Sequence, residues 1–102
     1  MPIERWNEDV EGPFAEDALR RKLEERGFRV ERCVYQSGEV FPEHAHESDK
    51  LAAVVSGRFR VKLEGRAYVL EAGDCLAVPR GVAHSAEVVG DVPVVGFDAE
   101  KG

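Results

Sequence analysis

Three histidines in two short segments are the strongest candidates for chemistry in this 102-residue chain. His44 and His46 lie two residues apart, and His84 stands farther along, three residues after Gly81. In an extended segment, residues two apart share a face, so we expect the imidazoles of His44 and His46 to point the same way. A third imidazole from another strand would complete a facial set of nitrogen ligands, and neutral imidazole suits zinc, copper, iron or nickel.

The glycines and prolines around these histidines resemble the two motifs of the cupin superfamily. The first motif, G-x5-H-x-H-x3-E-x6-G, is matched from Gly38 to Gly57, and the second, G-x5-P-x-G-x2-H-x3-N, is matched from Gly73 onward. Nearly every fixed spacing agrees. The resemblance to small, single-domain, RmlC-like cupins implies a jelly-roll β-barrel. It also implies a divalent transition metal, Zn, Fe, Ni, Cu or Mn, bound by His44, His46 and His84.

The sequence departs from the first motif at its acidic position, where it carries Lys50, and from the second at its Asn position, where it carries Val88. At about 4 Å and an effective dielectric constant of about 20, two unit charges interact by about 4 kcal/mol, so an ammonium group strongly opposes a divalent ion. Three outcomes are open. Lys50 turns outward and pairs with Glu43, Glu47 or Asp49, it lies over the pocket and binds an anionic ligand, or the site has lost its metal.

Glu43 and Glu47 flank the histidine pair and are therefore further candidates for the site. Either carboxylate could replace the missing acidic ligand. Both could instead hold the imidazoles in one tautomer by accepting a hydrogen bond from the nitrogen that faces away from the metal. We therefore expect Lys50, Glu43 and Glu47 to contribute to ligand binding.

Composition indicates one folded, soluble domain. The chain is 43% hydrophobic and 33% charged, with a net charge of −6 and no basic stripe, which argues against nucleic-acid binding. Its apolar runs are too short to cross a membrane, and no signal peptide follows Met1. Cys33 and Cys75 do not form a disulfide framework and are expected to be reduced, which favours a cytoplasmic location.

The elements that would position the histidines are mostly strands. We expect residues 1–27 to form an N-terminal arm and one short helix, which begins near Pro13 and ends at Gly27. Residues 28–102 then show seven or eight short strands separated by turn signals, such as 29–36 and 51–56, within a single structural domain. This pattern predicts an all-β, antiparallel sandwich or barrel. The jelly-roll topology itself follows from the resemblance to cupins.

In such a barrel, the pocket is expected in the mouth, beside the histidines. Apolar walls are expected there, although core packing explains most of the candidates: Phe41, Leu51, Val54, Phe59, Val61, Leu76 and Val78. The two phenols, Tyr35 and Tyr68, cannot be placed from the sequence.

Three functions are compatible with the sequence. The first is a metal-dependent enzyme of dioxygenase, isomerase or lyase type that acts on a small molecule at the three-histidine site, with no catalytic residue identified. The second is a non-catalytic sensor or carrier of a small ligand, with weak or no metal binding, in which Lys50 is the counter-charge of an anion. The third is a structural domain with vestigial histidines. A homodimer is also expected, with the segment around Trp6 covering a barrel edge.

Overall fold

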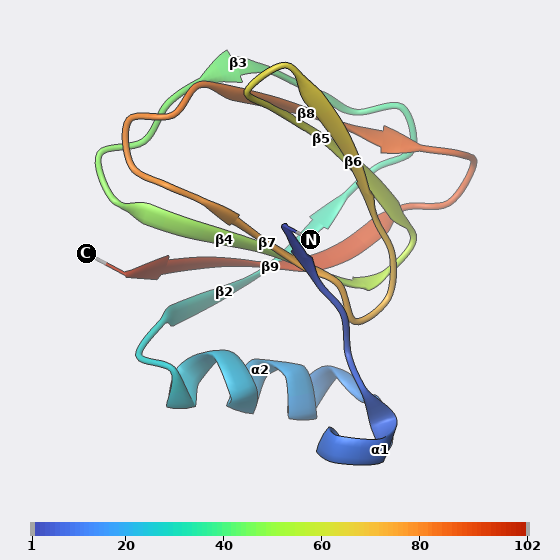
Figure 1. Ribbon diagram of the computed structural model, residues 1–102. Coiled ribbons are helices and arrows are strands. Elements are labelled where there is room, and N and C mark those ends of the chain that lie inside the picture. The colour runs from blue at the N-terminus through green and yellow to red at the C-terminus, as the bar shows by residue number, and fades with distance from the viewer. Residues whose placement is uncertain (1, 102) are drawn as a thin grey trace.

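Strands dominate the computed structural model, which describes residues 2–101. The elements follow each other as β1 (Ile3–Glu4), α1 (Glu8–Glu11), α2 (Glu16–Glu25), β2 (Arg29–Tyr35), β3 (Val40–His44), β4 (Asp49–Ser56), β5 (Arg58–Leu63), β6 (Arg66–Leu70), β7 (Cys75–Val78), β8 (His84–Val89) and β9 (Val94–Lys101) (Figure 1). All strand pairs are antiparallel, so the predicted all-β antiparallel class is confirmed.

The strands form two sheets that face each other (Figure 1). One sheet has the order β1-β7-β4-β9-β2, and the other has the order β3-β8-β5-β6. Strands that are distant in the sequence are therefore neighbours: β4 lies between β7 and β9, and β8 lies between β3 and β5. This arrangement is consistent with the expected jelly roll. It also places β3, which carries His44, beside β8, which carries His84.

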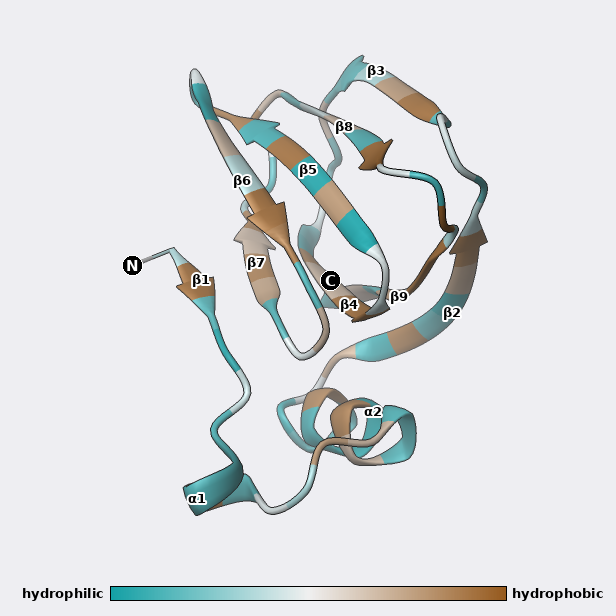
Figure 2. Ribbon diagram, turned by 90° about the vertical axis from the view of Figure 1, so that its right-hand side faces the viewer, coloured by the Kyte–Doolittle hydropathy of each residue, from teal (hydrophilic) through white to brown (hydrophobic). Residues whose placement is uncertain are grey.

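The main apolar core lies between the two sheets. Along β5, Phe59, Val61 and Leu63 are buried while the residues between them are basic, and Figure 2 shows this alternation. Strand periodicity explains the pattern, because successive side chains point to opposite faces. The buried members of this core are Ile3, Val54, Phe59, Val61, Leu63, Leu70, Leu76, Val78, Val88 and Val94.

Helix α2 covers the outer face of the β1-β7-β4-β9-β2 sheet (Figure 1). Leu19 and Leu23, both fully buried, pack there against Leu51, Ala53, Cys75, Phe97 and Ala99. The expected helix lying against a sheet is thus present. It begins at Glu16 rather than near Pro13. It ends two residues before Gly27, whose φ of +91° lies in the left-handed region that glycine adopts readily.

The first twelve residues are more structured than the sequence predicts. Strand β1 pairs with β7 through Ile3, which lies opposite Leu76. A second helix, α1, follows, and the side chain of Asn7 caps it by accepting a hydrogen bond from the backbone N–H of Asp9. The expectation of a single N-terminal helix was therefore wrong. A helix of four residues is too short to show an apolar period, and its cap alone indicates it.

Trp6 packs within its own chain. Its indole N–H donates to the carbonyl of Gly12 at 2.8 Å, and its ring lies edge-on to Phe14 at a centroid distance of 5.5 Å. The Lys22 ammonium lies 5.2 Å from the centre of the same ring. These contacts hold Trp6 against its own chain, and the expected dimer contact of this segment stays a prediction. Neither helix within residues 2–101 has the length and apolar character that crossing a bilayer would require.

Candidate metal centre

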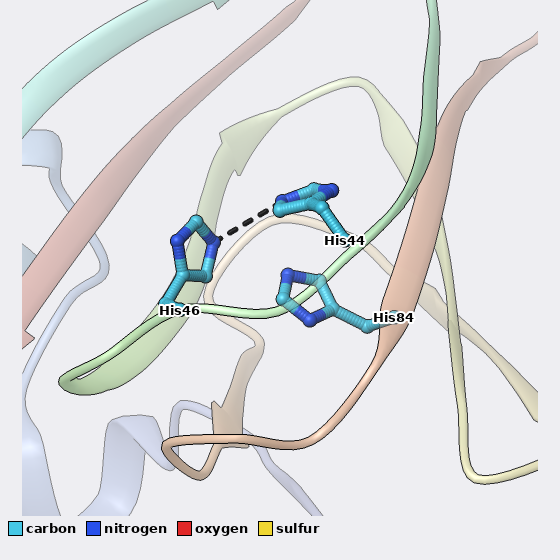
Figure 3. A group of neighbouring side chains, drawn as sticks. All are labelled: His44, His46 and His84. Atoms are coloured by element: carbon cyan, nitrogen blue, oxygen red, sulfur yellow. Dashed lines mark hydrogen bonds between the residues drawn. The ribbon is translucent and has the colours of Figure 1, made fainter.

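The three histidines converge at one end of the cavity between the sheets. His44 ends β3 and lies opposite His84, the first residue of β8, in the antiparallel pair, and His46 follows two residues after His44. Figure 3 shows the three rings turned toward one another. One ring nitrogen from each residue can be chosen such that all three lie within 4.8 Å of one another. The structure therefore brings together the three residues that the sequence singles out.

His46 is held by a contact that the sequence argument did not anticipate. Strand β3 ends at His44, and its register shifts between Phe41 and His44, so an unbroken strand is not what aligns the pair. Instead, the backbone N–H of Gly81 donates to the carbonyl of His46 at 2.8 Å. A turn residue of the second motif thus fixes a histidine of the first motif.

Backbone carbonyls select the tautomers of two of the imidazoles. Nδ1 of His44 lies 2.7 Å from the carbonyl oxygen of Pro42, and Nδ1 of His84 lies 3.0 Å from that of Val82. Because a carbonyl only accepts, each Nδ1 carries the proton and each Nε2 keeps its lone pair. Nε2 of His44 is 3.1 Å from Nε2 of His46. The Nε2 lone pair of His44 is therefore directed toward the ring of His46, inside the cluster.

Burial increases along this set, since His44 is exposed, His46 is half-buried and His84 is 8% exposed. Burial also lowers the pKa of His46, and the neighbouring imidazoles and Lys50 lower it further. A metal binds only the neutral imidazole, so a lowered pKa reduces competition from protons.

Among the residues that the structure describes, neither Glu43 nor Glu47 is hydrogen-bonded to one of the three rings. Both are exposed, and neither lines the cavity beside the histidines. The carbonyls of Pro42 and Val82 occupy the two Nδ1 atoms that these carboxylates were expected to hold. Carbonyls two residues before each histidine provide this support locally, and no side-chain pattern reveals them.

Lys50 lines the cavity and is paired with acids of β9. Its Nζ lies 3.2 Å from Oδ2 of Asp98 and 3.1 Å from Oε1 of Glu100, and its side chain is only 16% exposed. The strand register explains the contacts, because Lys50 lies directly opposite Glu100 and one pleat away from Asp98. Each partner stabilises the ammonium form of Lys50, whose pKa is raised even though burial opposes this.

Of the three outcomes left open for Lys50, outward pairing with Glu43, Glu47 or Asp49 is therefore not the one that the structure shows. Asp49 instead accepts a hydrogen bond from the backbone N–H of Arg80 at 2.9 Å. The sequence argument missed Asp98 and Glu100 because it considered only neighbours along the chain. The partners of Lys50 come from a strand about 50 residues away, and only sheet pairing brings them close.

The cavity beside the histidines has a volume of about 270 Å³ and mostly apolar walls. Tyr35 and Phe59 stack on one side with ring centres 5.4 Å apart, and Phe41 lies edge-on to both. Val54 and Leu76 do not line the cavity and belong to the core, as expected for most of the candidates. The residues that line the cavity include Tyr35, Phe41, Leu51, Phe59, Val61, Val78, Val94 and Asp98.

Comparison with known proteins supports this picture of the fold. The model of the cupin domain family matches residues 31–100. No curated protein sequence matches the chain. Among solved structures, an RmlC-like cupin from Shewanella frigidimarina is 29% identical with a TM-score of 0.64, and the alignment covers 72% of this chain and 64% of that one.

KdgF from a Halomonas species is 28% identical with a TM-score of 0.63, over 72% of this chain and 68% of that one. A DMSP lyase, DddQ from Ruegeria pomeroyi, is 21% identical with a TM-score of 0.66, over 74% of this chain and 38% of that one. The chain thus spans about two thirds of the length of the Shewanella and Halomonas proteins, and less of the lyase.

Proposed function

This chain belongs to the cupin family, and from that premise we propose that it binds one divalent transition metal ion and acts on a small molecule beside it. The proposed ligands are Nε2 of His44, His46 and His84. The observation that carries the proposal is the convergence of these three rings. The Nδ1 atoms of His44 and His84 are already hydrogen-bonded to backbone carbonyls. Hydrogen bonds of this kind fix the orientation and tautomer of metal-binding histidines.

The donor set is suited to such an ion. Three neutral imidazoles favour Zn, Fe, Ni or Cu, and Mn belongs to the same proposal with oxygen donors from a small ligand. With three protein ligands, an ion keeps positions open, and it can polarise an oxygen of a bound molecule as a Lewis acid. The reaction classes that fit are those of a dioxygenase, an isomerase or a lyase.

The cavity sets the size and character of the molecule. A cavity of about 150 Å³ accommodates benzene, so the 270 Å³ here suits a molecule of about ten non-hydrogen atoms. Phe41, Phe59 and Tyr35 supply an apolar wall that would exclude water from the apolar part of the bound molecule. The polar end of the molecule would lie toward the histidines.

The alternative of a non-catalytic carrier that binds an anion through Lys50 has less support. Asp98 and Glu100 already neutralise the Lys50 ammonium, so it is not a free counter-charge for a carboxylate ligand. A sensor that binds an uncharged small molecule, with or without metal, remains the second candidate, because the apolar cavity favours such a ligand. The homodimer and the cytoplasmic location stay predictions from the sequence.

Elemental analysis tests the proposed function. The unmodified protein, purified without added metal and then reconstituted, is expected to hold about one ion per chain. The His44→Ala, His84→Ala double variant should hold almost none. Glu43→Gln is the matched control, because Glu43 adjoins His44 but is exposed and does not line the cavity beside the histidines. Unmodified protein that stays metal-free after reconstitution, or a double variant that binds as much as the unmodified protein, would contradict the proposal.

A further inference from the structure

A carboxylate lies in the histidine cavity even though Lys50 replaces the acid of the first motif. We propose that the Asp98 carboxylate, delivered from β9 and held by Lys50, supplies the negative charge that lets the three-histidine site accept a divalent cation. This inference rests on the metal binding proposed above. It assigns Lys50 a positioning role and Asp98 an electrostatic role.

The two side chains occupy the same cavity as the imidazoles. Strands β4 and β9 are neighbours in the sheet, and Asp98 lies opposite Ala52, two residues from Lys50 on the same face of β4. Both carboxylate oxygens of Asp98 approach Nζ of Lys50, at 3.2 and 3.3 Å. Lys50, Asp98 and the three histidines together line this cavity.

Asp98, rather than Glu100, is the carboxylate that acts on the cavity. Glu100 also contacts Lys50, but it is shared with the exposed Arg29, whose Nη2 lies 2.6 Å from Oε2 of Glu100. Glu100 does not line the cavity, whereas Asp98 does. Asp98 pairs with the Lys50 ammonium, which lines the same cavity and opposes a cation there.

Asp98 acts through space rather than as a ligand. Among the residues described, the set of donor atoms within 4.8 Å of one another consists of the three imidazoles. A carboxylate nearby still favours a divalent ion, because charges interact over several ångströms inside a partly buried site. Without Asp98, the positive charge of Lys50 would oppose the ion with less compensation.

A charge-deletion cycle with Zn²⁺ as the probe tests the inference. Isothermal titration calorimetry at low ionic strength compares the unmodified protein with Asp98→Asn and with Lys50→Met, Asp98→Asn. Asp98→Asn should bind Zn²⁺ about tenfold more weakly, because it leaves the ammonium uncompensated. The double variant, which loses both charges, should return to within about threefold of the unmodified protein.

Glu100→Gln is the matched control, since it removes a carboxylate from the same ion-pair network outside the cavity. Its Zn²⁺ affinity should stay within about threefold of the unmodified value. Circular dichroism checks that each variant is folded. If Asp98→Asn does not fold, Asp98→Ser takes its place.

Two results would overturn the inference while leaving metal binding intact. One is an Asp98→Asn protein that binds Zn²⁺ as tightly as the unmodified chain. The other is a folded double variant as weak as Asp98→Asn, because the loss would then not come from charge. Failure of the unmodified protein to bind Zn²⁺ would instead refute the proposed function, and this inference with it.

Discussion

Saturating Zn²⁺ should raise the thermal unfolding temperature of this protein, because its proposed ligands meet only in the folded chain. His44 and His84 face each other across the β3–β8 pair, and the Gly81 contact brings His46 to them. In the unfolded chain, nothing holds His84 near His44 and His46, which are about 40 residues earlier in the sequence. An ion that binds the folded state alone therefore shifts the folding equilibrium toward it.

The size of the shift follows from the affinity and the chain length. At a free Zn²⁺ concentration one hundred times Kd, the free energy of unfolding increases by about 2.7 kcal/mol. A chain of 102 residues has an unfolding entropy of about 0.21 kcal/mol/K near 60 °C, so the unfolding temperature should rise by about 13 °C.

Differential scanning calorimetry with and without Zn²⁺ measures this rise. His46→Ala is the informative variant because His46 is less buried than His84, so the fold is less disturbed. Its unfolding temperature should rise by less than about 4 °C at the same Zn²⁺ concentration. Glu47→Gln, a change in the next residue, should behave as the unmodified protein does. An equal rise in His46→Ala and the unmodified protein would refute the reasoning.

Three further outcomes are expected. Asp74→Asn should lower the free energy of unfolding by about 1–3 kcal/mol in urea titrations. The buried Asp74 carboxylate accepts hydrogen bonds from Arg5 at 2.8 Å and from the backbone N–H of Glu71 at 2.9 Å. An unchanged unfolding midpoint would count against this reasoning. Burial lowers the pKa of His46, so the metal-free folded chain takes up protons less readily than the unfolded chain, and its free energy of unfolding should fall as the pH drops below about 6.5. The fall should be smaller in His46→Gln, and identical pH profiles would contradict that origin. Phe59→Leu removes the ring stacked on Tyr35 and should lower the free energy of unfolding by about 1–2 kcal/mol in urea titrations. Its Zn²⁺ affinity, measured by calorimetry, should stay within about twofold of that of the unmodified protein. A large loss of Zn²⁺ affinity would be the contrary result.

Local patterns predicted most of the strands after residue 28 and singled out the histidines that the structure brings together. Alternation along β5 is a property of consecutive residues, so Phe59 and Val61 could be assigned to the core without knowledge of any partner strand. The spacing of His44, His46 and His84 within two glycine- and proline-bounded motifs likewise located the cluster. The hydrogen bond that fixes His46 was hidden, because it comes from the backbone of Gly81.

Features that depend on pairing between distant strands could not be predicted. The sequence gives no sign that Lys50 lies between Asp98 and Glu100, because the β4–β9 register creates those contacts. The contacts of Trp6 within its own chain were missed for a similar reason. Its ring packs on Phe14, and the helix between the two residues, α1, is too short to show an apolar periodicity in the sequence.

A two-bond proton–nitrogen NMR spectrum of the imidazoles, recorded without and with one equivalent of Zn²⁺, tests most directly whether the three histidines share an ion. The Nε2 resonances of His44, His46 and His84 should all shift on binding. Nδ1 of His44 and of His84 should stay protonated throughout, since each donates to a backbone carbonyl. Zn²⁺ bound at full occupancy with any of the three Nε2 resonances unmoved would contradict a three-histidine metal centre.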